Sequence, residues 1–256
     1  MGRRNKVKLK RNDLFIGIYI LSAVLFFIIS IPSWLLDILL AFNIMVALVI
    51  LFNSLFAKEV LDMASFPTML LFTTIFRISL NVSSTKMILR DGYAGHVVSV
   101  FGQFVGGGNL VIGTIIFIVL IIVQFIVINK GSERVSEVTA RFTLDAMAGK
   151  QMAIDSDLNT GAITDKEAAE RRKKLQQENS FFGSMDGATK YVKGDATAGL
   201  IITAINLVGG IAMGMLYNGM SINDALSTYS ILTIGDGLCS LDTFTSYIFV
   251  NRYISY

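Results

Sequence analysis

Long apolar runs separated by short polar breaks dominate the pattern along the chain. Residues 14–31 and 34–56 form the first two runs, and each is long enough to cross a hydrocarbon core of about 30 Å as a helix. Pro32 separates them within "SIPSWLLD", so we predict two membrane spans joined by a tight turn. The first run follows a basic segment, but no small-residue cleavage site comes after it, which argues against a signal peptide.

The third run, "TMLLFTTIFRISLNV" after Pro67, is short for a span and contains Arg77. A charged side chain in hydrocarbon is costly and normally faces a bundle interior or an aqueous path. The alternative is that Arg77 reaches the interface along its aliphatic stem. Residues 111–128 and 197–217 are further spans, and a sixth begins near Tyr229. We therefore predict five complete spans and part of a sixth.

The segment between the fourth and fifth spans, residues 129–196, carries eleven basic and eleven acidic residues. So charged a segment cannot lie in hydrocarbon. Basic side chains within residues 1–13 place the N-terminus in the cytoplasm by the positive-inside rule. They are Arg3, Arg4, Lys6, Lys8, Lys10 and Arg11. Counting spans from that end returns residues 129–196 to the cytoplasm.

Two helices are predicted within this cytoplasmic segment. In "SERVSEVTARFTLDAMAG", residues 132–149, apolar side chains recur at intervals of three and four, which predicts an amphipathic helix. The stretch "TDKEAAERRKKLQQEN" opens with a capping box at Thr164 and Glu167 and is polar nearly all round. That pattern indicates a solvated helix projecting from the membrane, or one that packs only in an assembly. The first helix contains three charged residues to which we return: Arg134, Arg141 and Asp145.

Composition agrees with an all-α, polytopic membrane protein, because 53% of the residues are hydrophobic, 16% are charged and the mean hydropathy is +0.62. A single cysteine, Cys239, and a single histidine, His96, exclude a disulfide framework and a His-pair zinc site. "DSDLNTG" begins like a calcium loop but lacks the glycine and glutamate that such a loop needs. No glycine-rich phosphate loop is present. We expect no metal, no cofactor and no nucleic-acid partner.

The remaining chemistry is charge near the ends of the spans. Lys190 and Asp195 directly precede the fifth span, and Asp236 lies inside the sixth. Ionisable groups in such places are candidates for proton relays, because their protonation responds to nearby charge and to desolvation. The alternative is that they are ordinary interfacial charges, which fits Asp236 least because it lies deepest in an apolar run.

Several long stretches of the sequence resemble the N-terminal membrane half of the FlhA family, also called the FHIPEP family. They include "SFPTMLLFTTIFRISLNVSSTKMIL", "SERVSEVTARFTLDAMAGKQMAIDSDLN" and "MDGATKYVKGDATAGLIITAINLVGGI", and the resemblance extends from about Asn12 to Ser240. It implies a large export-gate component of flagellar or injectisome type III secretion in the bacterial inner membrane, not an enzyme. It also implies a homo-oligomeric ring, export of unfolded substrates driven by the proton motive force, and partners among the export membrane proteins and the export ATPase complex.

Charged positions that the family uses in export or proton coupling have counterparts here. They are Arg77, Arg134, Arg141, Asp145, Lys190, Asp195 and Asp236. On the view that Asp195 is a solvated charge, we expect Asp195→Asn to stop secretion at a stability cost of at most about half a kcal/mol.

A flagellar role is favoured over an injectisome role, and the injectisome role stays open. A small ion-coupled transporter is a further alternative, but it would require an inverted repeat that the sequence lacks.

The sequence departs from the family pattern at two places. Ala148 stands where the family usually has proline, and after Ser240 the chain reads "LDTFTSYIFVNRYISY" where the family continues with further spans and a soluble domain. A single-base insertion near Leu241 would explain this, so we expect residues 241–256 to be out of frame and the product to be an inactive fragment if that soluble domain is required. Because Asp236, Asp242 and Arg252 are costly in lipid, we also expect residues 229–256 to insert poorly or to lie at the surface.

The predicted order of segments is then a basic N-terminus at 1–13, four spans within 14–128, the cytoplasmic segment at 129–196, spans five and six within 197–240, and the tail at 241–256.

Overall fold

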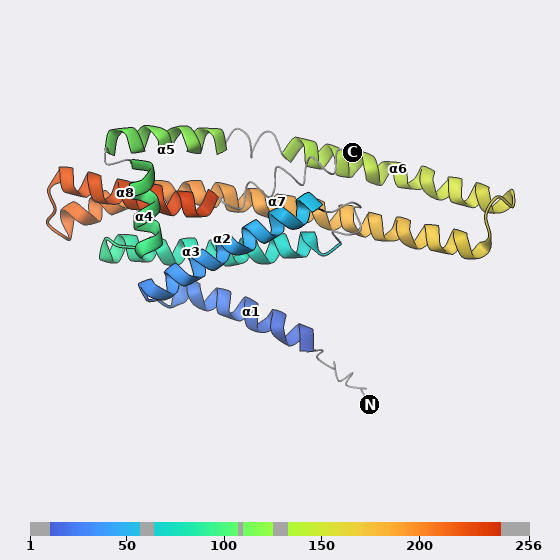
Figure 1. Cartoon of the computed structure of the whole chain (residues 1–256), viewed down its shortest axis with the longest axis horizontal. Coiled ribbons are helices and arrows are strands. Elements are labelled where there is room, and N and C mark those ends of the chain that lie inside the picture. Colours follow the sequence, from blue (N-terminus) through green and yellow to red (C-terminus); the bar gives the residue numbers. More distant parts are fainter. Residues whose placement is uncertain (1–10, 57–63, 107–109, 125–132, 242–256) are drawn as a thin grey trace, which may run out of the picture.

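A computed structural model describes residues 11–56, 64–106, 110–124 and 133–241, and the regular structure in these ranges is entirely α-helical (Figure 1). This confirms the predicted fold class. The helices are α1 (Arg11–Ile28), α2 (Ser33–Phe56), α3 (Phe66–Asp91), α4 (His96–Gly106), α5 (Leu110–Gln124), α6 (Glu133–Asn159), α7 (Asp165–Leu216) and α8 (Ile222–Leu241).

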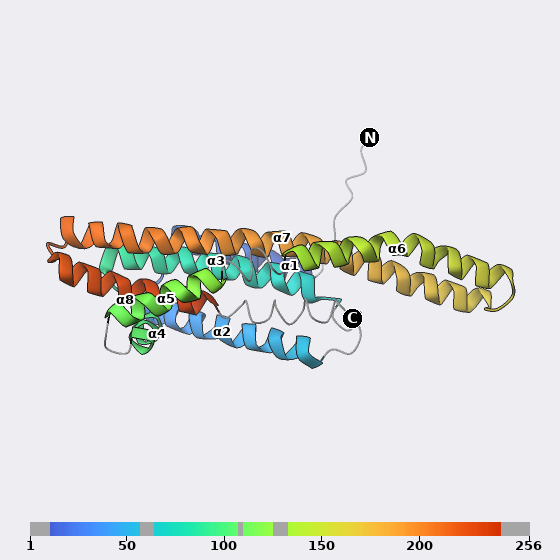
Figure 2. The same ribbon diagram turned by 90° about the horizontal axis from the view of Figure 1, so that it is seen from above.

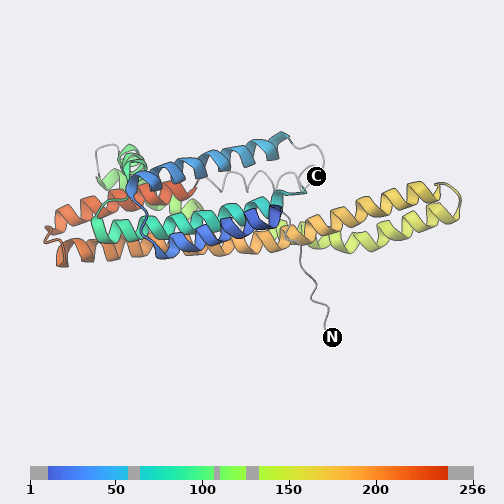
Figure 3. The same cartoon turned by 90° about the horizontal axis from the view of Figure 1, so that it is seen from below.

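The helices form an elongated bundle from which an antiparallel pair, α6 and the first half of α7, extends at one end (Figures 1 and 2). Within the bundle, α3 packs against α1, α2, α7 and α8. The short helix α4 crosses the bundle instead of running along it, and packs on α8 (Figures 1 and 3). Helix α3 is therefore the centre around which the other long helices are arranged.

Three of the described helices are long and apolar enough to cross a membrane, judged by length and composition: Ser33–Ser54, Phe66–Asp91 and Asp165–Leu216. Apolar stretches at Gly17–Ile28 and Val111–Val123 are shorter. The chain is thus a helical membrane protein, while the count of five complete spans and part of a sixth stays a prediction.

Two boundaries differ from the sequence-based expectation. The third run is not short, because α3 continues for 26 residues through a polar second half to Gly92, whose φ of 59° ends the helix. The projecting helix and the fifth span are not separate elements, because α7 is one helix of 52 residues. A change of surroundings from water to lipid leaves the helical hydrogen bonds unchanged, so the change in polarity near residue 196 marks no break in conformation.

The sixth apolar segment also differs from expectation. Helix α8 begins at Ile222, before Tyr229, and Tyr229, Leu232 and Ile234 are buried. The expectation that residues 229–256 lie at the surface is therefore wrong for residues 229–240, which are part of the bundle. Apart from Leu241, the tail at 241–256 lies outside the described residues.

Two apolar clusters form the core, one at each end of α3. The first joins α2, α3, α4 and α8, and includes Leu36, Leu80, Ile88, Val98 and Tyr229. The second lies where the α6–α7 pair meets the bundle, and joins residues of α2, α3, α6 and α7. Its members are Ile50, Phe66, Leu70, Met147, Phe181, Phe182, Met185, Ala188 and Val192. Residues 181–192 of the predicted cytoplasmic segment thus pack against the bundle. The part of the α6–α7 pair that projects is the part nearer to the connection between the two helices (Figure 1).

Helices α4 and α8 cross with their backbones in contact. A side-chain carbon added to Gly235 would overlap the carbonyl group of Val98, and one added to Gly102 would overlap the carbonyl group of Ile231. Glycine at a helix crossing permits such close approach, as in other membrane bundles. The crossing fixes α8 at the residue directly before Asp236.

Candidate functional site

Arg77 lies in the middle of α3, between the two apolar clusters, and only 2% of its surface is exposed. Its guanidinium group forms a salt bridge with the carboxylate of Asp195 on α7, which is also buried. Arg77 therefore faces the bundle interior, and the alternative that it reaches the membrane interface is wrong. Because each charge compensates the other, loss of either partner would leave a buried charge unpaired.

Burial of Asp195 corrects an expectation from the sequence. Asp195 is 5% exposed and paired, so it is not a solvated charge. Neutralising it removes the partner of a buried guanidinium, and the stability cost must exceed the half kcal/mol or so that applies to exposed charges. An export defect in Asp195→Asn would then need to be separated from a loss of folded protein.

Asp236 on α8 is buried as well, and uncharged groups hold its carboxylate. Oδ1 accepts a hydrogen bond of 2.5 Å from the hydroxyl of Ser84 on α3, and Oδ2 accepts one of 2.9 Å from the side-chain amide of Asn206 on α7. Burial opposes the charged form of a carboxyl group, whereas donated hydrogen bonds favour it. The carboxylate is thus supported by one donor from each of two neighbouring helices.

Ser240 connects the two charged sites. Nη1 of Arg77 donates to the backbone carbonyl of Ser240 at 3.3 Å. The Ser240 hydroxyl lies 3.0 Å from Oδ1 of Asn81 and 3.0 Å from the backbone carbonyl of Asp236. Having one hydrogen, it donates to one of these acceptors at a time. A continuous polar network therefore leads from Asp195 through Arg77 and the half-buried Ser240 to the helical turn that carries Asp236.

Asp37 on α2 determines where α4 begins. Its two carboxylate oxygens accept hydrogen bonds of 2.9 Å from the backbone N–H groups of His96 and Val97, the first residues of α4. Gly95 precedes them with a φ of 95°, and a side-chain carbon at this position would overlap the Asp37 carboxylate. An acidic group at a helix N-terminus satisfies free N–H groups and interacts favourably with the helix dipole. His96 is exposed at the first position of this helix.

The other predicted site residues lie away from this network. Lys190 is exposed on α7 and pairs with Asp186 at 2.7 Å. Arg141 and Asp145 are exposed on α6. Arg134 belongs to α6, but its side chain lies outside the described part of the chain. The structure therefore brings together Arg77, Asp195 and Asp236, and leaves the remaining candidates on the α6–α7 pair or near its base.

Four polar residues of the network were not singled out from the sequence: Asn81, Ser84, Asn206 and Ser240. A signal for two of them was present, because Arg77, Asn81 and Ser84 are spaced by four and three residues and so share one face of a helix. Asn206 is an isolated polar residue in an apolar span. Only contact with α8 shows why it is there.

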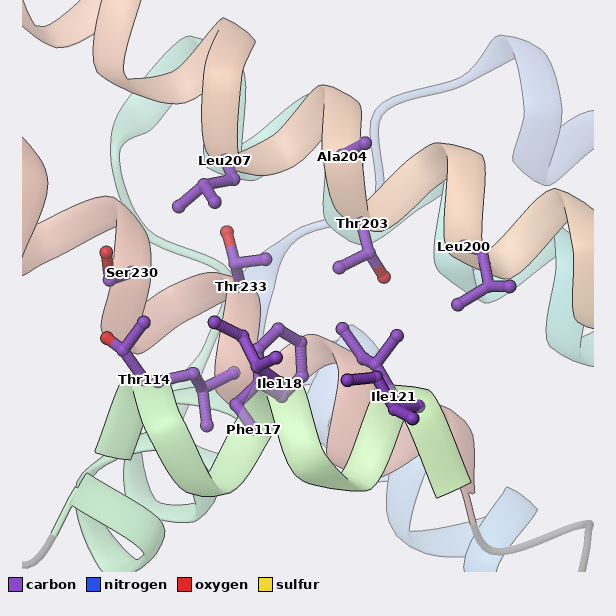
Figure 4. A pocket seen from close by; sticks show the side chains of 12 residues that line it. Thr114, Phe117, Ile118, Ile121, Leu200, Thr203, Ala204, Leu207, Ser230 and Thr233 are labelled. Carbon is purple, nitrogen blue, oxygen red and sulfur yellow. The ribbon is translucent and has the colours of Figure 1, made fainter. Parts of the chain in front are cut away.

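A cavity of about 680 Å³ lies between α5, α7 and α8 (Figure 4). Its walls are mainly aliphatic, with Ile118 and Ile121 of α5 facing Thr203 and Leu207 of α7. Thr233 on α8 also lines it and is 1% exposed, and its hydroxyl has no hydrogen-bond partner among the described residues. Thr233 lies one helical turn before Asp236 and is a natural control for the residues that do contact the carboxylate.

Comparison with known proteins gives consistent results. The model of the FHIPEP family matches residues 23–241. The flagellar biosynthesis protein FlhA of Bacillus subtilis (strain 168) is 54% identical over 228 residues, which cover 89% of this chain and 34% of that protein. FlhA of Salmonella typhimurium is 51% identical over 226 residues (86% and 33%), and the low calcium response locus protein D of Yersinia pestis is 49% identical over 231 residues (90% and 33%). The chain thus spans about a third of the length of the curated relatives it matches. No solved structure matches the chain.

Proposed function

Because the chain belongs to the FHIPEP family, we propose that it is a membrane component of the flagellar type III protein export apparatus and couples the proton motive force to export of unfolded flagellar proteins. It is a transport component and not an enzyme. The FlhA relatives support the flagellar assignment, with identities of 54% and 51%.

The single observation that carries the coupling role is the buried network around Arg77, Asp195 and Asp236. Ionisable groups inside a membrane bundle are expensive and mark ion or proton pathways. Arg77 and Asp195 compensate each other's charge. The Asp236 carboxylate is held by the neutral donors Ser84 and Asn206, so it is the group that takes up and releases a proton in this proposal.

Four other charged residues on α6 and α7 have a different proposed role. Arg134, Arg141, Asp145 and Lys190 belong to the surface that meets export partners, namely the other membrane proteins of the apparatus, the export ATPase complex and the exported proteins. In this arrangement the N-terminus and the α6–α7 pair face the cytoplasm, the protein is multi-pass in the bacterial inner membrane, and several copies form a ring.

An injectisome role is the second candidate, and a specific observation favours it. The low calcium response locus protein D of Yersinia pestis and the harpin secretion protein HrpI of Erwinia amylovora are 49% and 50% identical to the chain. These values lie close to those of the flagellar relatives, and the buried network would serve either apparatus.

A segment exchange tests the proposed function independently of where this chain begins and ends. In Bacillus subtilis FlhA, the segment that matches residues 23–241 is replaced by those residues, and flagellin secretion and swimming are measured. We expect the chimera to secrete and its Asp236→Asn variant to lose secretion, with the protein still present in the membrane. Asp157→Asn, which neutralises an exposed carboxylate on α6, is the matched control and should secrete normally. Normal secretion by Asp236→Asn would refute the coupling role.

A further inference from the structure

Two uncharged side chains donate hydrogen bonds to the Asp236 carboxylate. Ser84 and Asn206 are both fully buried, and they approach the carboxylate from different helices, α3 and α7. We propose that Ser84 and Asn206 are positioning residues that hold Asp236 in the geometry required for proton uptake, an inference that rests on the coupling role proposed above.

Asn206 provides the sharper observation. Its amide nitrogen donates to Asp236, but its carbonyl oxygen is buried without a hydrogen-bond partner among the described residues. Leaving a buried polar atom unsatisfied costs free energy that an aliphatic side chain of similar size would avoid. Packing alone therefore gives no reason for an asparagine here, whereas a donor aimed at a buried carboxylate does.

Ser84 acts from the opposite side of the same group. Its hydroxyl lies 2.5 Å from Oδ1 of Asp236 and 3.0 Å from the backbone carbonyl of Asn81. One hydrogen can serve only one acceptor at a time, so a charged carboxylate competes for it against a helix carbonyl. A hydrogen bond to a charged acceptor is the stronger of the two, which keeps the Ser84 hydroxyl directed to Asp236 while the carboxylate is charged.

The two groups described above as donors to the Asp236 carboxylate are neutral. Among the described residues, the charge linked to Asp236 by hydrogen bonds is Arg77, which reaches the same turn of α8 through Ser240 and is already paired with Asp195. Helix α5 carries no charged side chain, and α4 carries only His96 at its exposed end. Removal of either neutral donor should therefore change the state of the carboxylate directly.

The test is infrared spectroscopy of the full chain, reconstituted in liposomes of phosphatidylethanolamine and phosphatidylglycerol, with isotope-labelled aspartate. The carboxyl band of Asp236 is the one lost in Asp236→Asn. We expect Ser84→Ala and Asn206→Leu each to shift this band, because each removes a hydrogen bond from the group. Asn206→Gln retains an amide donor and should restore at least part of the signal. Thr233→Val, which removes a neighbouring buried hydroxyl that makes no hydrogen bond among the described residues, should leave the band in place.

Export in the chimera completes the test. Asn206→Leu should lower secretion by about tenfold, in keeping with loss of a hydrogen bond to a charged group, whereas Thr233→Val should leave secretion unchanged. Circular dichroism shows whether each variant is folded. If Asn206→Leu does not fold, the test relies on Ser84→Ala alone.

The two proposals fail in different ways. An unshifted carboxyl band in both donor variants overturns the positioning role and leaves the coupling role intact. A shifted band together with normal secretion in Asp236→Asn refutes the coupling role, and with it the functional meaning of the positioning.

Discussion

The bundle and the projecting α6–α7 pair use the same residue types in opposite ways. In the bundle, Arg77 and Asp195 are buried, and at most about 5% of either residue is exposed. On the projecting pair, Arg171 and Arg172 of α7 face Asp157 and Asp155 of α6 at 3.2 and 2.5 Å, and all four side chains are about half exposed. Exposed ion pairs contribute about 0–1 kcal/mol, whereas removing one partner of a buried pair costs about 3–5 kcal/mol. An arginine–aspartate contact therefore carries different weight in the two regions.

The largest expected effect comes from breaking the buried pair. Asp195→Ala should destabilise the protein by about 3–5 kcal/mol, because the guanidinium group of Arg77 stays buried without its partner. Denaturant unfolding of the full chain in detergent, followed by circular dichroism, measures the change. The double variant Arg77→Met/Asp195→Leu should regain much of the lost stability, since neither charge remains, but should not support export in the chimera. A double variant as unstable as the single variant would show that the pair matters through shape and not through charge.

The glycine crossing sets the next effect. Gly235→Ala should cost about 1–3 kcal/mol, because the added methyl group overlaps the backbone of α4. It should also displace the neighbouring Asp236 and so shift the carboxyl band. Gly194→Ala on α7 is the control, because nothing lies within 4 Å of its side-chain position and alanine is the better helix former by about 1 kcal/mol. Equal stability of the two variants would contradict the close crossing of α4 and α8.

The capping of α4 by Asp37 should be worth about 0.5–2 kcal/mol. Asp37→Ala removes both acceptors for the first N–H groups of α4, so we expect faster hydrogen exchange across residues 96–106 with little change in α7. Asp37→Asn keeps one acceptor oxygen and should give an intermediate rate. Unchanged exchange in both variants would show that α4 is held by its crossing with α8 alone.

The smallest effect belongs to the projecting pair. The capping box of α7 has the Thr164 hydroxyl accepting from the Glu167 N–H at 3.3 Å, while the Glu167 carboxylate accepts from the Thr164 N–H at 2.8 Å. Thr164→Ala should cost about half a kcal/mol, the low end of the range for caps, because the site is exposed. Hydrogen exchange of residues 165–170 provides the measurement, and an effect as large as that of Asp195→Ala would abolish the distinction between the two regions.

The same cap has a definite pH dependence. The hydrogen bonds from Thr164 hold the pKa of Glu167 below its ordinary value. A lowered pKa in the folded state means that the stabilisation is present above the ordinary glutamate pKa and is lost as the pH falls through the lowered value. Protection of this turn from exchange should therefore decline on acidification in the native sequence, and Glu167→Gln should remove that dependence.

The sequence predicted the helical class, two helices within the polar segment, and Arg77, Asp195 and Asp236 as candidate site residues, but neither the burial of Asp195 nor the way α3 is completed. Its many polar residues lower the mean hydropathy of this helix, yet Thr73, Thr74 and Ser79 donate to carbonyl groups one turn earlier, at 2.7, 2.7 and 2.8 Å. Such bonds satisfy the hydroxyls within their own helix, so these residues can be buried. Average hydropathy does not register this, because it treats each polar group as unsatisfied.

The contacts of Asp37, Asn206 and Asp236 depend on other helices, and no local pattern reports them. Asp37 lies 59 residues before the N–H group of His96, and Asn206 lies 30 residues before Asp236. Each of these residues has only apolar residues or glycine directly beside it in the sequence, which indicates that a partner exists but not which one. The glycines at 102 and 235 are comparable, since each was one of many glycines until the crossing showed which backbone it approaches.

The unbroken length of α7 has a mechanical consequence. At 1.5 Å per residue, its 52 residues form a rod of about 78 Å, and about 45 Å separate its first residue, Asp165, from Asp195. A helix resists axial compression, because shortening it would require breaking its hydrogen bonds. A force applied at the outer end is therefore delivered to Asp195 and Asn206 without a flexible joint in between. Tilting the rod about the apolar contacts of Phe181 and Phe182 would move its inner segment in the opposite direction, as a lever turns about a fulcrum.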